Sequence, residues 1–149
     1  MTPVTIRQAV LADVECIAPL FDDYRQFYEK SSDLQAARSF LAERFNHGES
    51  VVFIAEENGI SVGFTQLYPS FSSVSLRRVF ILNDLFVASS HRGKGVGAML
   101  LQAAVEYSRS LDAVRVSLNT DIKNTSAQRM YEAEGWKQDQ EYYAFHLKL

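Results

Sequence analysis

The stretch NDLFVASSHRGKGVGAMLL, residues 83–101, decides how the rest of the sequence is interpreted. It begins as an apolar strand, continues as a polar turn with a glycine at every second position from Gly93 to Gly97, and ends as an apolar helix. The first N–H groups of a helix have no partner within the helix, and the helix dipole adds partial positive charge there. Glycines let a phosphate approach these N–H groups, and Arg92 and Lys94 add positive charge. The stretch therefore predicts a site for a phosphate-containing ligand.

The composition indicates a single globular domain spanning residues 1–149. Hydrophobic residues make up 47% of the sequence and charged residues 22%, and a chain of this length can bury one core. No apolar run reaches the roughly 20 residues of a membrane span, and the first residues lack the layout of a signal peptide. The net charge of −3 argues against a nucleic-acid partner, because binding a phosphate backbone requires a basic surface.

The cysteine and histidine content limits the chemistry further. The single Cys16 cannot form a disulfide within the chain, which suits a cytoplasmic protein, and its place on an apolar helical face predicts a core residue. The spacing of His47, His91 and His146 is not that of a metal site, so we expect no metal. His91 adjoins Arg92 and could contact a phosphate, although an exposed turn residue is the alternative.

Hydrophobic periodicity predicts an α/β domain. Asn58 and Gly59 predict a hairpin, and Ser32 followed by Gln35 predicts a capping box at a helix start. The order of elements gives a mixed, mainly antiparallel sheet with one right-handed β-α-β crossover. We expect about seven strands and about four flanking helices. The clearest strands lie at residues 4–7, 51–56, 60–68, 76–87, 114–119 and 142–149, and the helices at 14–28, 32–48, 95–109 and 126–134.

A dinucleotide site is one interpretation of the glycine turn. Gly93, Gly95 and Ala98 fit the G-x-G-x-x-A form of the dinucleotide fingerprint, and Asp121 follows the next strand. In that fingerprint the first glycine lies almost directly at the strand end, whereas residues 88–92 intervene here. The strand also follows a hairpin instead of opening a series of parallel β-α-β units. Both differences argue against a dinucleotide.

The same turn, written Arg92-x-x-Gly95-x-Gly97, resembles the acetyl-CoA-binding motif of the GNAT superfamily of N-acetyltransferases. The segment NTSAQRMYEAEGW, residues 124–136, also has the spacing of this family, and the order of elements agrees over nearly the whole chain. The resemblance implies the GNAT fold. In that fold, the strand at 76–87 is splayed from its parallel neighbour, and the pantetheine arm of the cofactor lies in the gap.

The resemblance also implies which residues bind acetyl-CoA, the acyl donor. Main-chain N–H groups of residues 92–97 would bind the diphosphate, and the backbone of residues 85–87 would pair with the pantetheine arm like an added strand. An N–H group of Phe86 or Val87 would polarise the thioester carbonyl, and Asn124 matches a position that contacts the cofactor arm. The expected cofactor-binding residues are Leu85, Phe86, Val87, Arg92, Gly93, Lys94, Gly95, Val96, Gly97, Asn124, Ala127 and Tyr131.

Two catalytic residues are expected. Tyr131 matches the tyrosine that protonates the departing thiolate, and a phenol with a pKa of about 10 stays protonated at neutral pH; packing on its helix is the alternative role. A primary amine must lose a proton before it attacks, and Asp84 is the candidate base because it lies on the cofactor strand. Diamine and thialysine acetyltransferases, which the sequence resembles distantly, carry a Glu at the position of Asn83, so their base and substrate do not transfer directly.

The acceptor site is expected between the first two helices and the hairpin that precedes residues 76–87. Two segments rich in polar and aromatic residues, DDYRQFYE (22–29) and TQLYPSFSS (65–73), would form opposite walls around an ammonium group. A solvated acidic helix face is the alternative for the first segment. The expected substrate-binding residues are Asp23, Tyr24, Tyr28, Gln66, Tyr68 and Asn83, with Asp22 as a further candidate.

The resemblance implies direct transfer of acetyl from acetyl-CoA to a primary amine, with a small molecule as the expected acceptor. No covalent enzyme intermediate is expected, because Cys16 lies on the wrong element to be the nucleophile. Two alternatives stay open, namely a protein or peptide acetyltransferase and a non-catalytic acyl-CoA sensor of the same fold. Many relatives form homodimers, and residues 142–149 could contribute to such an interface.

Overall fold

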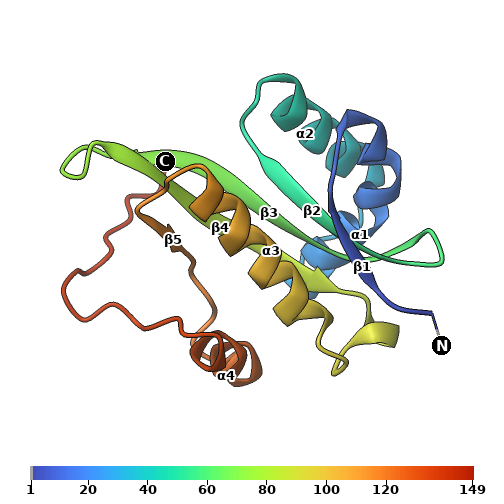
Figure 1. The fold of residues 1–149 in the computed structure, drawn as a ribbon. Helices are drawn as coiled ribbons and strands as arrows, with labels where there is room; N and C mark the ends of the chain where they lie inside the picture. Colours follow the sequence, from blue (N-terminus) through green and yellow to red (C-terminus); the bar gives the residue numbers. More distant parts are fainter. Residues whose placement is uncertain (1) are drawn as a thin grey trace. The chain divides into compact units, whose positions relative to one another are not determined.

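The computed structural model describes residues 2–149. Their backbone contacts divide the chain into two compact units, Met1–Asn119 and Thr120–Leu149. No helix within residues 2–149 has the length and apolar character that crossing a bilayer requires. The first unit contains β1 (Thr5–Gln8), η1 (Leu11–Asp13), α1 (Val14–Phe27), α2 (Leu34–Asn46), β2 (Val51–Glu57), β3 (Ile60–Ser72), β4 (Arg77–Val87), η2 (Ser89–His91), α3 (Val96–Ser110) and β5 (Arg115–Ser117), and the second contains α4 (Thr125–Ala133) (Figure 1).

The sheet has five strands in the order β1-β2-β3-β4-β5. The first three pairs are antiparallel, and β4 and β5 are parallel. The hairpin between β2 and β3 is confirmed: Asn58 and Gly59 both have positive φ, at 53° and 74°, as a two-residue hairpin of type I′ requires. The sheet is therefore mixed and mainly antiparallel, as predicted, with α3 as the crossover helix between its parallel strands.

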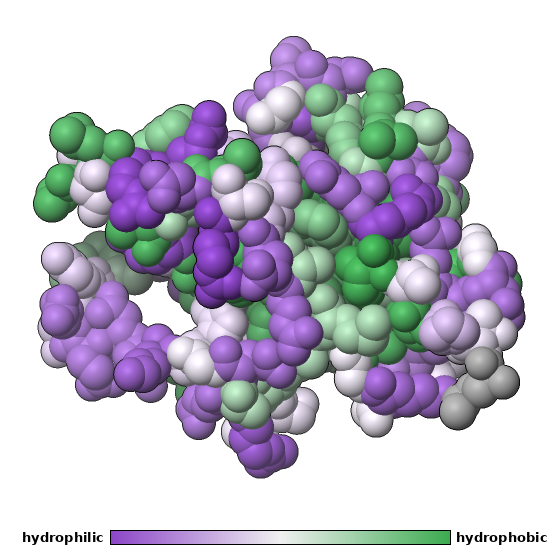
Figure 2. All heavy atoms as spheres, in the orientation of Figure 1, coloured by the Kyte–Doolittle hydropathy of each residue, from purple (hydrophilic) through white to green (hydrophobic). Residues whose placement is uncertain are grey.

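Alternating residues of the strands form two apolar faces. On one face, Val52, Ile54, Phe64 and Phe86 belong to a buried cluster with residues of α1 and α2. On the other face, Phe53 and Phe80 each pack against the Tyr107 ring of α3, with ring centroids 5.7 Å apart. Hydrophilic and hydrophobic residues are interspersed on the face that Figure 2 shows. The strand period therefore decides which side chains of β3 and β4 meet α1 and α2.

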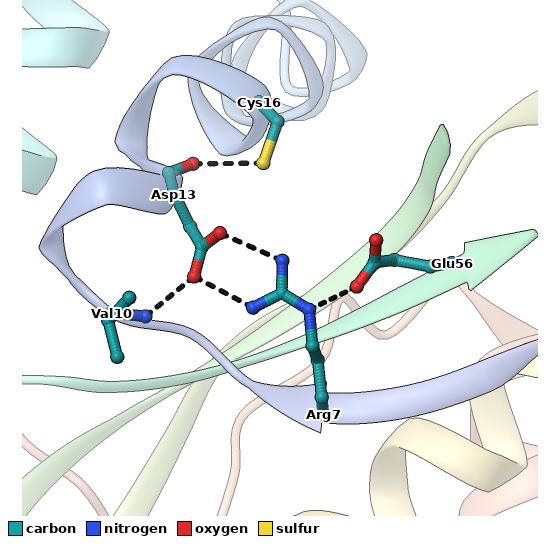
Figure 3. A network of polar contacts seen from close by, with 5 residues as sticks. All are labelled: Arg7, Val10, Asp13, Cys16 and Glu56. Atoms are coloured by element: carbon teal, nitrogen blue, oxygen red, sulfur yellow. Dashed lines mark hydrogen bonds and ion pairs between the residues drawn. The ribbon is translucent and has the colours of Figure 1, made fainter. Parts of the chain in front are cut away.

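A polar network joins β1, η1 and β2 near the start of the chain (Figure 3). The two terminal nitrogens of Arg7 donate to the Asp13 carboxylate at 2.9 and 2.8 Å, and its Nε donates to Glu56. The guanidinium of Arg7 lowers the pKa of Asp13. The Cys16 thiol donates to the Asp13 carbonyl at 3.1 Å and is exposed, so its predicted place in the core is wrong. The core-facing residues of α1 include Val14 and Ile17, and the helical turn places Cys16 on another side.

Several predicted boundaries differ from the structure. About seven strands were expected, and the described residues contain five. Residues 142–149 form no strand, although apolar and polar residues alternate there. They have no ladder partner among the described residues, and a strand exists only through such pairing.

The start of α2 also differs from the prediction. Its N-cap is Asp33 rather than Ser32, because the Asp33 carboxylate accepts the Ala36 N–H at 3.0 Å. Both residues suit an N-cap, and the main-chain path selected Asp33.

The second unit contains one helix with a defined start and end. The Asn124 side chain accepts the Ala127 N–H at 3.3 Å and caps α4. At the other end Gly135 has a φ of +93°, and the N–H groups of Gly135 and Trp136 donate to the carbonyls of Glu132 and Tyr131. These two bonds form a Schellman motif, which also explains the ring contact of Tyr131 with Trp136.

Candidate active site

The parallel strands β4 and β5 part within the first unit. They pair only where Val79–Ile81 of β4 faces Arg115–Ser117 of β5, and β4 continues to Val87. Among the described residues, no strand pairs with the second half of β4 on this side. An unpaired edge presents free N–H and C=O groups that an extended ligand can bind. The predicted splay is thus present.

The pairing of β3 with β4 decides which main-chain groups face this open edge. Ala88 donates its N–H to Val62 of β3 at 2.8 Å. Because N–H and C=O groups of alternate residues point to the same side, Phe86 also faces β3, whereas Leu85 and Val87 face the open edge. Of the two N–H groups expected to polarise a thioester, Val87 has the suitable direction.

A bulge in β4 sets this alternation. Gln66 pairs with Asp84 and Leu67 with Leu82, so Asn83 is an extra residue in β4. One extra residue reverses the side to which the following main-chain groups point. The bulge therefore turns Leu85 and Val87 toward the edge next to β5, and it also places Asn83 beside the buried Asp84.

The glycine turn leads from this edge into α3. Gly93 and Gly95 have φ values of +75° and +82°, and Gly95 is the N-cap of α3. The first bond of the helix joins the Met99 N–H to the Gly95 carbonyl at 3.1 Å, so the N–H groups of residues 96–98 have no partner within the helix. A Cβ atom on Gly95 would meet no protein atom within 4 Å. The helix start is therefore open toward a ligand.

Arg92 connects the turn to the end of β4. Its Nε donates to the Val87 carbonyl at 2.9 Å, and its guanidinium lies 5.2 Å from the Phe86 ring centre and 5.8 Å from that of Phe27. From the sequence, Arg92 was expected to neutralise phosphate charge and to bind the diphosphate through its main-chain N–H. Its side chain also fixes the turn against the strand that carries the open edge.

His91 connects the same turn to the β2–β3 hairpin. Its Nε2 lies 2.6 Å from a Glu57 carboxylate oxygen, and its Nδ1 lies 2.8 Å from the Ser90 hydroxyl. The His91 ring lowers the pKa of Glu57. His91 is partly buried, so it is not the freely exposed turn residue that we gave as the alternative.

Asp84 lies buried on the face of β4 that meets α1 and α2. Its carboxylate oxygens accept from Gln66 Nε2 at 2.6 Å and from Asn83 Nδ2 at 3.1 Å. The Tyr24 hydroxyl donates to the Asn83 carbonyl at 3.3 Å and is a further hydrogen-bond partner of the carboxylate. Burial raises the pKa of Asp84, because all of these partners are neutral and desolvation disfavours the charged form.

Two tyrosines next to Asp84 stay protonated over a wide pH range. Burial is the main cause that raises the pKa of Tyr24 and Tyr68, and the negative charge of Asp84 adds to it. The alternation of β3 places Gln66 and Tyr68 on the face that carries Asp84. The structure thus brings Tyr24 of α1 together with Gln66 and Tyr68 of β3 and Asn83 of β4, and Tyr28 contacts Tyr24 with ring centroids 5.1 Å apart. Their role in substrate binding stays a prediction.

Asp23 is exposed on α1, and Asp22 does not belong to this group. The carboxylate of Asp22 accepts from the Ser32 hydroxyl at 2.6 Å and from the Asp33 N–H at 2.8 Å. It therefore holds the segment between α1 and α2, and these contacts argue against its candidate role in substrate binding. Two acidic neighbours on a helix point in directions about 100° apart, which the sequence alone did not resolve.

The Asp22 contacts predict a stability effect. The Ser32 hydroxyl is the main group that lowers the pKa of Asp22. A lowered folded-state pKa gives stability that is present above the unfolded pKa and is lost as the pH falls through the folded pKa. Asp22→Asn should therefore reduce the free energy of unfolding by about 2 kcal/mol at pH 7, measured by urea denaturation. A difference from wild type that stays constant below pH 4 would contradict this explanation.

A family comparison decides the identity of the chain. A model of the acetyltransferase (GNAT) family matches residues 17–136. The uncharacterized N-acetyltransferase YhfO of Bacillus subtilis (strain 168) is 51% identical over 136 residues, which cover 91% of each sequence. The chain belongs to the GNAT family of acetyltransferases. It is an N-acetyltransferase, and members of this family use acetyl-CoA.

Solved structures show the GNAT fold independently. The crystal structure of a probable acetyltransferase has a TM-score of 0.92 and 43% identity and covers 97% of both chains. An aminoglycoside N-acetyltransferase, AAC(6')-Iy, in complex with CoA has a TM-score of 0.82 at 20% identity, covering 100% of this chain and 97% of that one. The second likeness concerns the fold alone. The aminoglycoside enzyme therefore shows CoA bound to a protein of this fold.

The GNAT residues of the second unit have local roles in the structure. Asn124 and Ala127 form the cap of α4, and Tyr131 lies in its last turns with its ring near Trp136. Their expected contacts with the cofactor stay predictions. No group of three or more His, Cys, Asp or Glu residues that could hold a metal occurs within residues 2–149.

Sequence reasoning missed three features of the GNAT site. The ring of Phe27 lies close to Arg92, Arg92 itself binds β4, and His91 binds Glu57. The sequence did contain a signal for the first feature: Tyr24 and Phe27 are three residues apart on one helix, so both rings lie on the same side of it. The other two depend on contacts between distant segments, for which the sequence offered no signal.

Proposed function

We propose that this N-acetyltransferase transfers the acetyl group of acetyl-CoA to a primary amine of a small molecule, with residues 1–149 acting as one catalytic domain. The observation that carries the proposal is the open edge of β4, which lies between a buried carboxyl group, Asp84, and the free N–H groups at the start of α3. The family match at 17–136 includes residues of both compact units, which supports a single domain.

The proposed cofactor site follows the open edge and the turn. The N–H groups of residues 96–98 and the glycines of the turn would bind the diphosphate, and Lys94, which is exposed, would add positive charge. Leu85 and Val87 would pair with the pantetheine arm through the main-chain groups that face the edge. Acetyl-CoA supplies the activated acyl group, and the N–H of Val87 would polarise its carbonyl.

The proposed proton transfers involve two residues. Asp84 would take a proton from the ammonium, directly or through one water molecule, so that the amine nitrogen can attack the carbonyl carbon. A C–N bond forms, the C–S bond breaks, and the Tyr131 hydroxyl would give its proton to the leaving thiolate. Tyr24 and Tyr68 stay protonated and would orient the amine. No enzyme nucleophile is needed, and Cys16 donates to the carbonyl of Asp13.

The proposal is tested by the release of free thiol from acetyl-CoA in the presence of primary amines and peptides. Thiol release with small amines, together with mass-spectrometric detection of the acetylated amine, is the expected result. Acetylation of peptides without turnover of small amines would instead support a protein acetyltransferase. Binding of acetyl-CoA with no turnover of any acceptor would support a sensor and overturn the proposal.

Tyr131→Phe should lower kcat by about 10- to 100-fold while the Kd for acetyl-CoA changes little, because the ring is kept and only the proton donor is lost. Steady-state kinetics and isothermal titration calorimetry measure the two quantities. Tyr143→Phe is the control, since Tyr143 is 92% exposed in the same unit and should behave like wild type. An unchanged kcat in Tyr131→Phe would exclude its role as the acid.

A further inference from the structure

Four aromatic rings and one guanidinium form a closed series of contacts in the first unit. The ring centroids of Tyr24 and Tyr28 are 5.1 Å apart, those of Tyr28 and Phe27 5.4 Å, and those of Tyr24 and Phe86 6.1 Å. The Arg92 guanidinium completes the series, because it lies within 6 Å of both Phe27 and Phe86. We call these four rings the aromatic wall. It extends from the neighbourhood of Asp84 to the open edge of β4.

The inner end of the aromatic wall provides acceptors for one ammonium. The Tyr24 hydroxyl lies at Asp84, whose other hydrogen-bond partners are amides. Within residues 2–149, the buried Oε1 of Gln66 has no hydrogen-bond partner, although buried polar atoms are normally paired. An ammonium has three N–H donors and no acceptor. A carboxylate, a hydroxyl and a spare amide oxygen match these donors.

The outer end of the aromatic wall is unsuited to a second ammonium. Arg92 carries a permanent positive charge, and its Nε is held at the Val87 carbonyl. Phe27 and Tyr28 are 58% and 45% exposed, so apolar ring surface is available to a ligand beside this charge. An apolar ligand body would cover these rings, whereas a second cationic group would meet a like charge.

Asp22 was a candidate to bind an ammonium, but its carboxylate is occupied by the Ser32 hydroxyl and the Asp33 N–H. We propose that the acceptor is a monocationic primary amine with an apolar alkyl or aryl body, whose ammonium lies at Asp84 and whose body lies on the aromatic wall. The inference rests on the proposed acetyl transfer and specifies its substrate class.

The test compares two amines that differ only at the far end of a six-carbon chain, n-hexylamine and 1,6-diaminohexane. The far groups are a methyl and an ammonium. Thiol release should give hexylamine a kcat/KM at least about tenfold above that of the diamine, because the second ammonium would meet the charge of Arg92, and 2-phenylethylamine should match or exceed hexylamine. A kcat/KM for the diamine that equals or exceeds that of hexylamine would overturn the inference and leave acetyl transfer intact.

Variants of the wall provide a second, independent measurement. Tyr28→Ala should raise the KM for hexylamine about three- to tenfold with a smaller change in kcat, and Tyr28→Phe should restore most of the loss because it keeps the ring. Phe71→Ala is the matched control, since Phe71 is 70% exposed near the other end of β3. An unchanged KM in Tyr28→Ala would also overturn the inference. Absence of both coenzyme A binding and thiol release with every amine would instead overturn the proposed function.

Discussion

Replacing Gly95 with leucine is expected to weaken acetyl-CoA binding by about 100-fold or more. Gly95 has a φ of +82° at the start of α3, and the space next to its Cα is open. A leucine there would strain the turn and place its side chain in front of the free N–H groups of the helix. Loss of two charge-assisted hydrogen bonds to phosphate costs about 3 kcal/mol, which corresponds to this factor.

The matched control for this variant is Gly48→Leu. Gly48 also has a positive φ, +62°, with no protein atom within 4 Å of an added Cβ, but it ends α2 on another part of the chain. Both variants should lose similar stability, and only Gly95→Leu should lose affinity in isothermal titration calorimetry. Equal affinities for acetyl-CoA in the two variants would contradict the assignment of the turn as the diphosphate site.

Asp84→Asn is expected to lower kcat by about 10²- to 10³-fold and to leave the Kd for acetyl-CoA unchanged, because an amide of the same shape cannot accept the proton of the amine. The wild-type kcat/KM should fall as the pH decreases through the raised pKa of Asp84, because the base is then protonated. The remaining kcat/KM of Asp84→Asn should not show this fall at low pH. Rate measurements across pH 4–9 test both expectations.

Asp84→Asn should not reduce the free energy of unfolding at high pH, in contrast to Asp22→Asn. A folded-state carboxyl pKa above the unfolded value means that stability falls as the pH rises through the interval between the two values. Asp84→Asn should therefore be neutral or stabilising at pH 8. Asp22→Asn is the control, because Asp22 is also a buried aspartate but holds the start of α2: it should lose stability and keep its kcat. A kcat for Asp84→Asn within threefold of wild type would exclude Asp84 as the base.

The regular elements of the first unit followed from local signals in the sequence. The Asn58-Gly59 hairpin requires positive φ at adjacent residues, which few other residue pairs allow. Gly93 and Gly95 mark a turn into a helix for the same reason, since both have positive φ. Elements with weak local signals were less well predicted: residues 142–149 alternate like a strand, but whether they pair depends on another part of the chain.

The sequence alone determined the family, the order of elements and the residue types of the site, because these depend on short motifs and on periods of 2 and 3.6 residues. The tertiary structure decided how the residues combine. The bulge at Asn83 selects Val87 rather than Phe86 for the open edge, and helix direction separates Asp22 from the site. Contacts of Arg92 with Phe27 and Phe86 join segments that are distant in sequence. Such contacts depend on packing in three dimensions, which no local period encodes.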